Sequence, residues 1–174
     1  LLTSLGVLVA LRAGQFNIGG EGQIYMGALG SAIAGLSIKG IPALIHVPLA
    51  LLAGFLFGGI WGLIPGYLKA VRGVNEVITT LLLNYIAFNL VSYLVQGPLM
   101  APNAPSPYSP IIPRSAQLPI ILPGSLAHAG ILVGLVAAGV LWVLLQRSPF
   151  GYRTAAVGMN PIAARYGGIS VQRT

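Results

Sequence analysis

The sequence predicts an all-α protein: a polytopic bundle of transmembrane helices with a short helix on its cytoplasmic side. Hydrophobic residues make up 56% of the 174 residues, and only 6% are charged, whereas an ordinary soluble domain carries about 25% charged residues. So few charges could not keep a soluble fold of this size dispersed in water. The composition therefore excludes a soluble enzyme and a disordered chain, and it predicts membrane lipid as the surroundings.

The charge pattern and the missing motifs exclude several other classes. The net charge of +7 comes from scattered Lys and Arg residues, with no basic stripe for nucleic acid to follow. Cys is absent, which excludes disulfides and thiolate metal sites. The sequence has no phosphate-binding loop, H-E-x-x-H or G-x-S-x-G motif, and the isolated His46 and His128 do not form a metal-site pattern. We expect no catalytic residues, no metal and no cofactor.

Apolar runs between charged residues define the expected spans. A helix needs about 20 mostly apolar residues to cross a hydrocarbon core. Four runs meet this need approximately, over residues 22–38, 44–68, 77–95 and 127–146, and the first is short and rich in glycine. Residues 1–11 resemble the end of a fifth span. We therefore expect residues 1–174 to be part of a single transmembrane domain of a longer protein.

The distribution of Lys and Arg predicts the orientation, because short cytoplasmic loops are enriched in both. The segments after the second and fourth complete spans share one side and collect Lys69, Arg72, Arg147, Arg153, Arg165 and Arg173, whereas the other side holds Lys39 and Arg114. This places residues 69–76 and 147–174 in the cytoplasm. Residues 96–126 carry eight prolines, so they predict an extended external loop, either a connector or a surface for an external partner.

Small residues recur at four-residue steps within the spans. These rows are Gly54, Gly58, Gly62 and Gly66; Gly27, Ser31 and Gly35; and Gly130, Gly134 and Ala138. Small side chains allow helix backbones to approach closely in lipid, where no hydrophobic effect drives helices together. The rows predict a tightly packed bundle and carry no chemistry of their own.

The third complete span carries two polar stripes on different faces. One contains Glu76, Thr80 and Asn84 toward the cytoplasmic half; the other contains Tyr85, Asn89, Ser92 and Gln96 toward the outer half. A polar group facing lipid costs several kcal/mol, so both stripes should face protein or water. Hydrogen bonds between helices and a polar translocation pathway both explain them.

Residues 16–23, Phe-Asn-Ile-Gly-Gly-Glu-Gly-Gln, interrupt two apolar runs. Glycines permit a break in the helix, and Asn17 could cap the helix that follows. A helix broken at membrane depth is tolerated only where it is buried in protein or lines a cavity. The alternative is a cytoplasmic turn with Glu21 near a helix N-terminus.

A second helix signal lies in the C-terminal segment. Asn160 is a good N-cap, Pro161 suits the first helical position and Gly167-Gly168 can end the helix. The resulting helix over residues 161–166 would carry Ile162 and Tyr166 on one side. An apolar anchor of this kind suits docking in a groove of a cytoplasmic partner, or contact with anionic lipid headgroups.

Three stretches, in this order, resemble one family. Residues 17–23 read N-I-G-G-E-G-Q, residues 73–78 read G-V-N-E-V-I with N-Y-I at 84–86, and residues 153–161 read R-T-A-A-V-G-M-N-P followed by A-A-R-Y-G-G-I at 163–169. Together they resemble the permease subunits of nucleoside- and simple-sugar-type ABC importers, within the branched-chain amino acid/ribose-type permeases. The resemblance covers nearly the whole chain, although Ile162 stands where the family often has an acid and members are about twice as long.

The resemblance implies a non-catalytic permease subunit in a bacterial plasma membrane. Its implied partners are two ATP-binding cassette ATPase subunits, a second permease subunit, equal or different, and an extracytoplasmic solute-binding protein. The residues expected to couple to the ATPase are Arg153, Gly158, Asn160, Pro161, Ala163, Ala164, Arg165, Tyr166 and Gly167.

For the translocation pathway we expect uncharged hydrogen-bonding groups and two acids: Asn17, Glu21, Asn75, Glu76, Thr80, Asn84 and Asn89. Mostly uncharged groups suit a neutral solute such as a nucleoside or a related sugar-containing compound. A secondary carrier or channel working alone is the alternative, because it too needs polar stripes and a broken helix. A membrane scaffold without transport would use the same polar groups for packing only.

Overall fold

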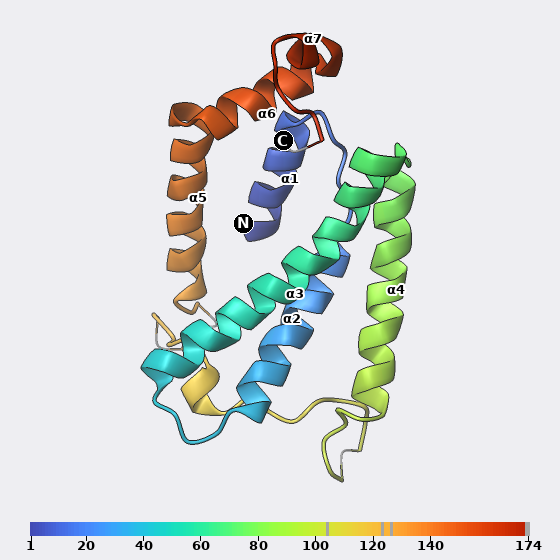
Figure 1. Ribbon diagram of the computed structural model, residues 1–174. Coiled ribbons are helices and arrows are strands. Elements are labelled where there is room, and N and C mark those ends of the chain that lie inside the picture. Colours follow the sequence, from blue (N-terminus) through green and yellow to red (C-terminus); the bar gives the residue numbers. More distant parts are fainter. Residues whose placement is uncertain (104, 123, 126, 173–174) are drawn as a thin grey trace.

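A computed structural model describes residues 1–103, 105–122, 124–125 and 127–172, and its helices are shown in Figure 1. Pro123 of the predicted external loop and Arg173 of the predicted cytoplasmic segment lie outside the described residues. Within the described residues the elements are α1 (Leu2–Arg12), α2 (Gly20–Ser37), α3 (Ala43–Arg72), α4 (Glu76–Gln96), the 3-10 helix η1 (Arg114–Ala116), α5 (Gly130–Arg147), α6 (Pro149–Met159) and α7 (Pro161–Tyr166). The predicted all-α fold class is confirmed.

Three of these helices are long and apolar enough to cross a membrane: α3, α4 and α5. They coincide with the expected spans at 44–68, 77–95 and 127–146. The remaining expected span, residues 22–38, coincides with α2. This helix has 18 residues but is not among the three membrane-length helices. Helix α2 packs against both α3 and α4, and its Met26 and Leu29 form a small core with Ala87 of α4. Because protein covers much of α2, it needs less apolar surface than a helix that faces lipid.

The contact between α2 and α3 depends on the predicted glycine row. A Cβ atom on Gly58 would lie 3.0 Å from the carbonyl oxygen of Gln23, and one on Gly27 would lie 3.2 Å from the carbonyl oxygen of Gly54. The Ser31 hydroxyl donates a hydrogen bond to the carbonyl of Ala50 at 2.9 Å. The backbones therefore approach closely, as the four-residue spacing predicts, although Gly66 at the end of the row has no neighbour within 4 Å.

At the end of the molecule opposite α7, the proline-rich segment folds back on the bundle. The His46 side chain, at the start of α3, is fully buried, and its Nδ1 shares a hydrogen bond with the Ser115 hydroxyl of η1 at 2.9 Å. A Cβ atom on Gly35 of α2 would lie 3.0 Å from the Ile112 side chain. His46 thus has a packing role that its isolated position in the sequence did not indicate, and the loop is not extended throughout.

The C-terminal segment contains two helices where one was expected. Ser148 caps α6 by accepting a hydrogen bond from the Phe150 N–H at 3.2 Å, and Pro149 stands in the first turn. Asn160 caps α7 in the same way, accepting from the Ile162 and Ala163 N–H groups at 3.0 Å. The predicted helix at 161–166 is confirmed, whereas α6 was missed even though Ser148-Pro149 has the same capping pattern as Asn160-Pro161.

Both expected cytoplasmic segments lie at one end of the molecule. Figure 1 shows the end of α3 and the start of α4 at the same end as α6 and α7, with η1 at the opposite end. This arrangement agrees with the pattern of Lys and Arg. That this end faces the cytoplasm remains a prediction from that pattern.

We expect Gly58→Leu to destabilise the protein by about 1–3 kcal/mol, because a larger side chain in a filled contact forces the helices apart. The neighbouring Gly59→Leu is the matched control, because a Cβ atom on Gly59 has no neighbour within 4 Å. Thermal unfolding of the full-length protein in detergent measures both. Equal unfolding temperatures for the two variants would contradict the close α2–α3 contact.

Candidate functional site

The chain between α1 and α2, residues 13–19, has no helical structure and packs against α4 at the buried Gly19. Gly14 has a left-handed φ of +72°, which favours glycine. After this turn the segment reaches Asn84, which lies eight residues after Glu76 at the start of α4, or about 12 Å along the helix axis. The start of α2 therefore lies beside α4 at a point about two helical turns after the start of α4. This position favours a helix broken at membrane depth over a turn at the membrane surface.

The Asn84 side chain satisfies the backbone at this break. Its Oδ1 accepts a hydrogen bond from the Gly22 N–H at 2.8 Å, and its Nδ2 donates to the carbonyl of Ile18 at 3.0 Å. The Gly22 N–H belongs to the first turn of α2, where backbone donors have no partner within the helix. Asn84 is thus a cap for α2 that comes from α4. Asn84 therefore joins the two motifs at residues 17–23 and 73–86. Hydrogen bonding between helices accounts for its place in the polar stripe of Glu76, Thr80 and Asn84.

Asn17 does not cap α2 as the sequence indicated. The N-cap residue is Gly19, which has no side chain of its own to cap the helix. The Asn17 Oδ1 instead accepts from the Gly19 N–H at 2.7 Å and stabilises a turn before the helix. Gly19 packs directly on α4, where its Cβ atom would lie 3.1 Å from the Cβ of Thr80. The close contact between the break and α4 therefore requires glycine at residue 19. Asn17 stabilises the turn just before this residue.

An ion pair joins α3 and α4 beside the break. The Lys69 Nζ lies 2.7 Å from the Glu76 carboxylate, with side chains 35% and 17% exposed. Lys69 is in the last turn of α3 and Glu76 is in the first turn of α4, and each charge is favourable at its own helix end. Since the pair is partly exposed, we expect it to stabilise the fold by about 1 kcal/mol or less, and its main effect is to neutralise both charges.

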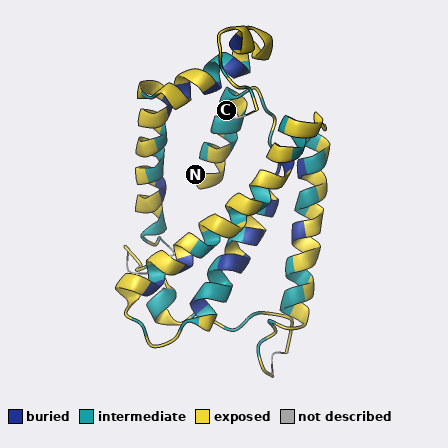
Figure 2. Ribbon diagram, viewed as in Figure 1, coloured by how far each residue is buried: buried dark blue, intermediate teal, exposed yellow. Residues whose placement is uncertain are grey.

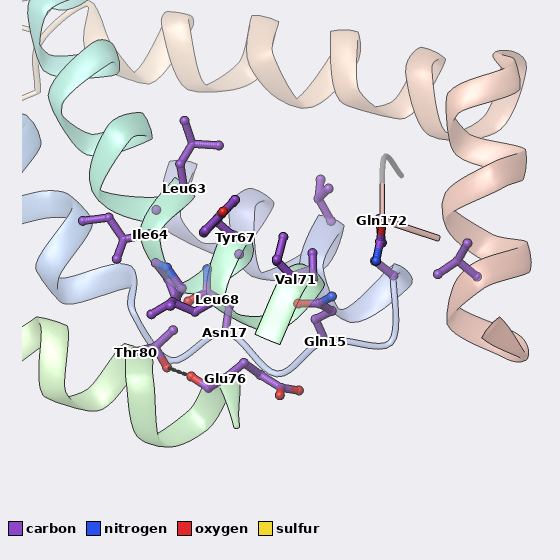
Figure 3. Close-up of a pocket in the computed structure, with 18 of the residues that line it drawn as sticks. Gln15, Asn17, Leu63, Ile64, Tyr67, Leu68, Val71, Glu76, Thr80 and Gln172 are labelled. Carbon is purple, nitrogen blue, oxygen red and sulfur yellow. Dashed lines mark hydrogen bonds between the residues drawn. The ribbon is translucent and has the colours of Figure 1, made fainter. Parts of the chain in front are cut away.

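These groups adjoin a cavity of about 940 Å³ between α3, the link after α1, the start of α4 and α6. Figure 3 shows the side chains of Gln15, Asn17, Tyr67, Glu76 and Thr80 around it. The rest of the lining is mostly apolar, and α6 contributes Phe150, Thr154 and Val157. A cavity of this size with few polar groups is typical of sites for small organic molecules.

The structure divides the predicted pathway residues. Asn17, Glu76 and Thr80 line the cavity, whereas Glu21, Asn75, Asn84 and Asn89 do not. Asn75 caps α4 by accepting from the Val77 N–H at 3.0 Å. Glu21 is exposed in the first turn of α2, and Asn89 is exposed on the outer side of α4, where its Nδ2 donates to the carbonyl of Tyr85 at 2.8 Å.

Sequence reasoning missed Gln15 and Tyr67, which also line the cavity. Gln15 lies two residues before Asn17, so the polar interruption at this break could have included it. Tyr67 follows an apolar run in α3 and has no signal of its own, because its role depends on where α3 lies relative to α1 and α6.

The predicted coupling residues lie on α6 and α7 or at their ends. Arg153 and Gly158 are in α6, Asn160 precedes α7, Pro161, Ala163, Ala164, Arg165 and Tyr166 are in α7, and Gly167 follows it. The apolar side chains expected on one face are open to solvent: Ile162 is 71% and Tyr166 90% exposed. Much of the α7 ribbon is coloured as exposed in Figure 2.

Two of the predicted coupling residues face inward instead. A Cβ atom on Gly158 would collide with the Arg12 carbonyl at the end of α1, and Ala164 is buried. These two residues connect α6 and α7 to the rest of the molecule and are not available to a partner.

An all-α bundle with membrane-length helices, a polar break beside a cavity and an exposed helix at one end defines a membrane permease domain. Residues 1–174 match the family described as branched-chain amino acid transport system / permease component, and the chain belongs to this family. Membership and the three membrane-length helices place it in the plasma membrane as a multi-pass protein. The resemblance found in the sequence motifs is confirmed.

Several characterised relatives match almost the whole chain. The guanosine ABC transporter permease protein NupP of Bacillus subtilis is 39% identical over 99% of this chain and 50% of its own length. The glucose ABC transporter permease protein TsgB13 of Haloferax volcanii is 37% identical over 98% of this chain and 47% of its own. The nucleoside ABC transporter permease protein NupB of Lactococcus lactis is 33% identical over all of this chain and 50% of its own. The chain thus spans about half the length of these relatives, and no solved structure matches it.

We expect Asn84→Ala to destabilise the protein by about 1–3 kcal/mol, because it leaves the Gly22 N–H and the Ile18 carbonyl without partners inside the bundle. Thr79→Ala is the control, since the Thr79 hydroxyl bonds within its own helix end, to the Asn75 carbonyl. Unfolding in detergent compares the two in the full-length protein. A loss for Asn84→Ala no larger than for Thr79→Ala would contradict the capping role.

Proposed function

We propose that this chain forms part of the translocation pathway of an ATP-binding-cassette importer for a nucleoside or another neutral, sugar-containing solute. Its membership of the permease family supports the transport role. The names of its relatives, which specify guanosine, nucleosides and glucose, support the solute class. The observation that carries the proposal is the cavity beside the broken helix.

The lining of the cavity favours a neutral solute. Among the described lining residues Glu76 is the one that carries a formal charge, and Lys69 neutralises it at 2.7 Å. Gln15 and Asn17 offer uncharged amide groups, and Tyr67 offers an aromatic ring. The buried Thr80 hydroxyl already donates to the Glu76 carbonyl at 2.7 Å. Amide and hydroxyl groups bind sugar hydroxyls and base edges without a charge to match, and an aromatic ring can stack on either.

The proposed partners are two ATPase subunits, a second permease chain and an extracytoplasmic solute-binding protein. A permease of this family would leave ATP hydrolysis to the ATPase subunits. The exposed Ile162, Arg165 and Tyr166 side chains of α7 form the surface that we assign to the ATPase. An apolar anchor beside a cation suits a helix seated in a groove.

Helix α6 provides the mechanical connection between this surface and the cavity. It carries α7 at one end, contributes Phe150, Thr154 and Val157 to the cavity wall, and meets the backbone at Arg12 through Gly158. A displacement of α7 by the ATPase therefore moves a wall of the cavity and the end of α1 together. Such rigid-body movement is a standard route to alternating access. A carrier or channel working alone would have no need of the exposed α7.

We expect Gln15→Cys and Tyr67→Cys in the full-length permease, with other cysteines removed, to react with a water-soluble maleimide, because both residues line the cavity. Phe55→Cys is the control, since Phe55 is exposed on α3 in a position expected to face lipid. Guanosine should protect the two cavity positions and leave the control unchanged. Labelling of Phe55→Cys alone would refute a pathway through this cavity.

We expect the double variant Arg165→Glu, Tyr166→Ala to lose the co-purifying ATPase and to reduce solute uptake to background, because it removes the anchor and reverses the charge of α7. The matched control is Lys39→Glu with Tyr108→Ala, which makes the same kinds of change in the segments after α2 and before η1 and should keep the ATPase bound. Uptake that follows an ion gradient and ignores the α7 double variant would support the lone carrier instead.

A further inference from the structure

The chain that follows α7 returns to the cavity. Two residues of this segment, Val171 and Gln172, are part of the cavity lining. Figure 3 shows Gln172 toward the end of the cavity where Gln15 and Val71 lie. Val71 belongs to the last turn of α3, so the segment reaches the cavity at the end of the molecule that carries α6 and α7.

The cavity extends from this end along α3. Its lining on α3 runs from Ile60 to Val71, and Val71 lies eleven residues after Ile60, about 16 Å along the helix axis. The pattern of Lys and Arg predicts that the end at Val71 faces the cytoplasm. Val171 and Gln172 therefore lie at the predicted cytoplasmic mouth of the cavity.

The end of α7 fixes the direction in which this segment leaves the helix. The Gly168 N–H donates to the Arg165 carbonyl at 3.0 Å, and the Ile169 N–H donates to the Ala164 carbonyl at 3.0 Å. These two bonds, with Gly168 at a φ of +80°, form a Schellman motif. Residue 169 is therefore held to α7 by the backbone, and the segment must follow α7 when the helix moves.

Apolar side chains support the same connection. Ala164 is buried and Ile169 is half-buried, and they occupy the two positions between which a Schellman motif usually makes an apolar contact. Ile162 and Tyr166 remain exposed. Helix α7 thus holds the returning segment with its buried side and presents its open side to a partner.

The side chains at the mouth suit a barrier that can be removed. Val171 is half-buried, and Ala13 and Val71 bring further apolar surface to the same cavity. An apolar constriction resists the passage of water and ions. A displacement of the segment that carries Val171 would widen such a constriction without breaking an ion pair.

We propose that residues 169–172 form a gate over the cytoplasmic mouth of the cavity, and that α7 moves this gate through the Schellman motif. The inference rests on the proposed function, because the ATPase supplies the movement of α7. A movement of α7 that draws residues 169–172 outward opens the mouth, and the solute then leaves toward the cytoplasm. The return of α7 closes it.

The first test measures access to the cavity from the cytoplasmic side. Tyr67→Cys in the full-length permease, with other cysteines removed, is labelled with a water-soluble maleimide in inside-out vesicles. Gln172→Ala should raise the labelling rate several-fold and Gln172→Trp should lower it, because the side chain at the mouth obstructs less or more. The matched control is Gln117→Ala, directly after η1, which should leave the rate unchanged. Equal rates in both Gln172 variants would overturn the gate.

The second test asks whether α7 moves the gate. Gly168→Val should reduce ATP-dependent uptake several-fold while the ATPase still co-purifies, because a β-branched residue is strained at a φ of +80°. Gly168→Asn is the matched control, since asparagine tolerates this conformation, and it should keep most of the uptake. A Cβ atom on Gly168 has no neighbour within 4 Å, so neither variant introduces a clash there. Equal uptake by the two variants would refute the role of α7.

Together the two measurements separate this inference from the proposed function. Labelling that responds to Gln172 in a permease without ATP-dependent uptake would retain the gate and refute the importer role. ATP-dependent uptake with labelling that ignores Gln172 would refute the gate and retain the importer role.

Discussion

The structure depends on one requirement: backbone groups inside a membrane need hydrogen-bond partners. The chain breaks between α1 and α2 beside α4, and Asn84 of α4 supplies two partners there, at 2.8 Å to the Gly22 N–H and 3.0 Å to the Ile18 carbonyl. Asn17 supplies a third to Gly19. Because these bonds fix where α2 begins, they also fix the position of the cavity that opens beside the break.

The same requirement explains why two distant motifs belong together. The glycines at residues 19 and 22 allow the break to approach α4, where a Cβ atom at either position would meet Thr80 or Asn84 at about 3 Å. The Gly-Val-Asn-Glu turn holds the start of α4 in place, because Asn75 caps the helix and Glu76 pairs with Lys69 of α3. Several polar residues that look like candidates for solute binding are therefore occupied by the fold itself, including the buried Thr80, and Gln15, Asn17 and Tyr67 remain to face the cavity.

Local signals in the sequence predicted the elements well, and contacts between distant residues limited the prediction of the site. Asn160-Pro161 predicted α7 and its cap, because capping involves neighbours in the chain, and Ser148-Pro149 carries the same local information for α6. Periodicity separated the two polar faces of α4 correctly. It could not show that Asn84 bonds to Gly22, 62 residues away, or that Tyr67 borders a cavity, because both depend on how the helices are arranged.

The length of α3 has a consequence for the shape of the pathway. Its 30 residues extend about 45 Å, whereas the hydrocarbon core is about 30 Å thick, so the helix fits the bilayer best at an oblique angle. Figure 1 shows it running diagonally, from η1 at one end to the start of α4 at the other. The cavity lies between the oblique α3 on one side and α1 and α6 on the other. A change in the tilt of α3 alone would therefore widen or narrow it.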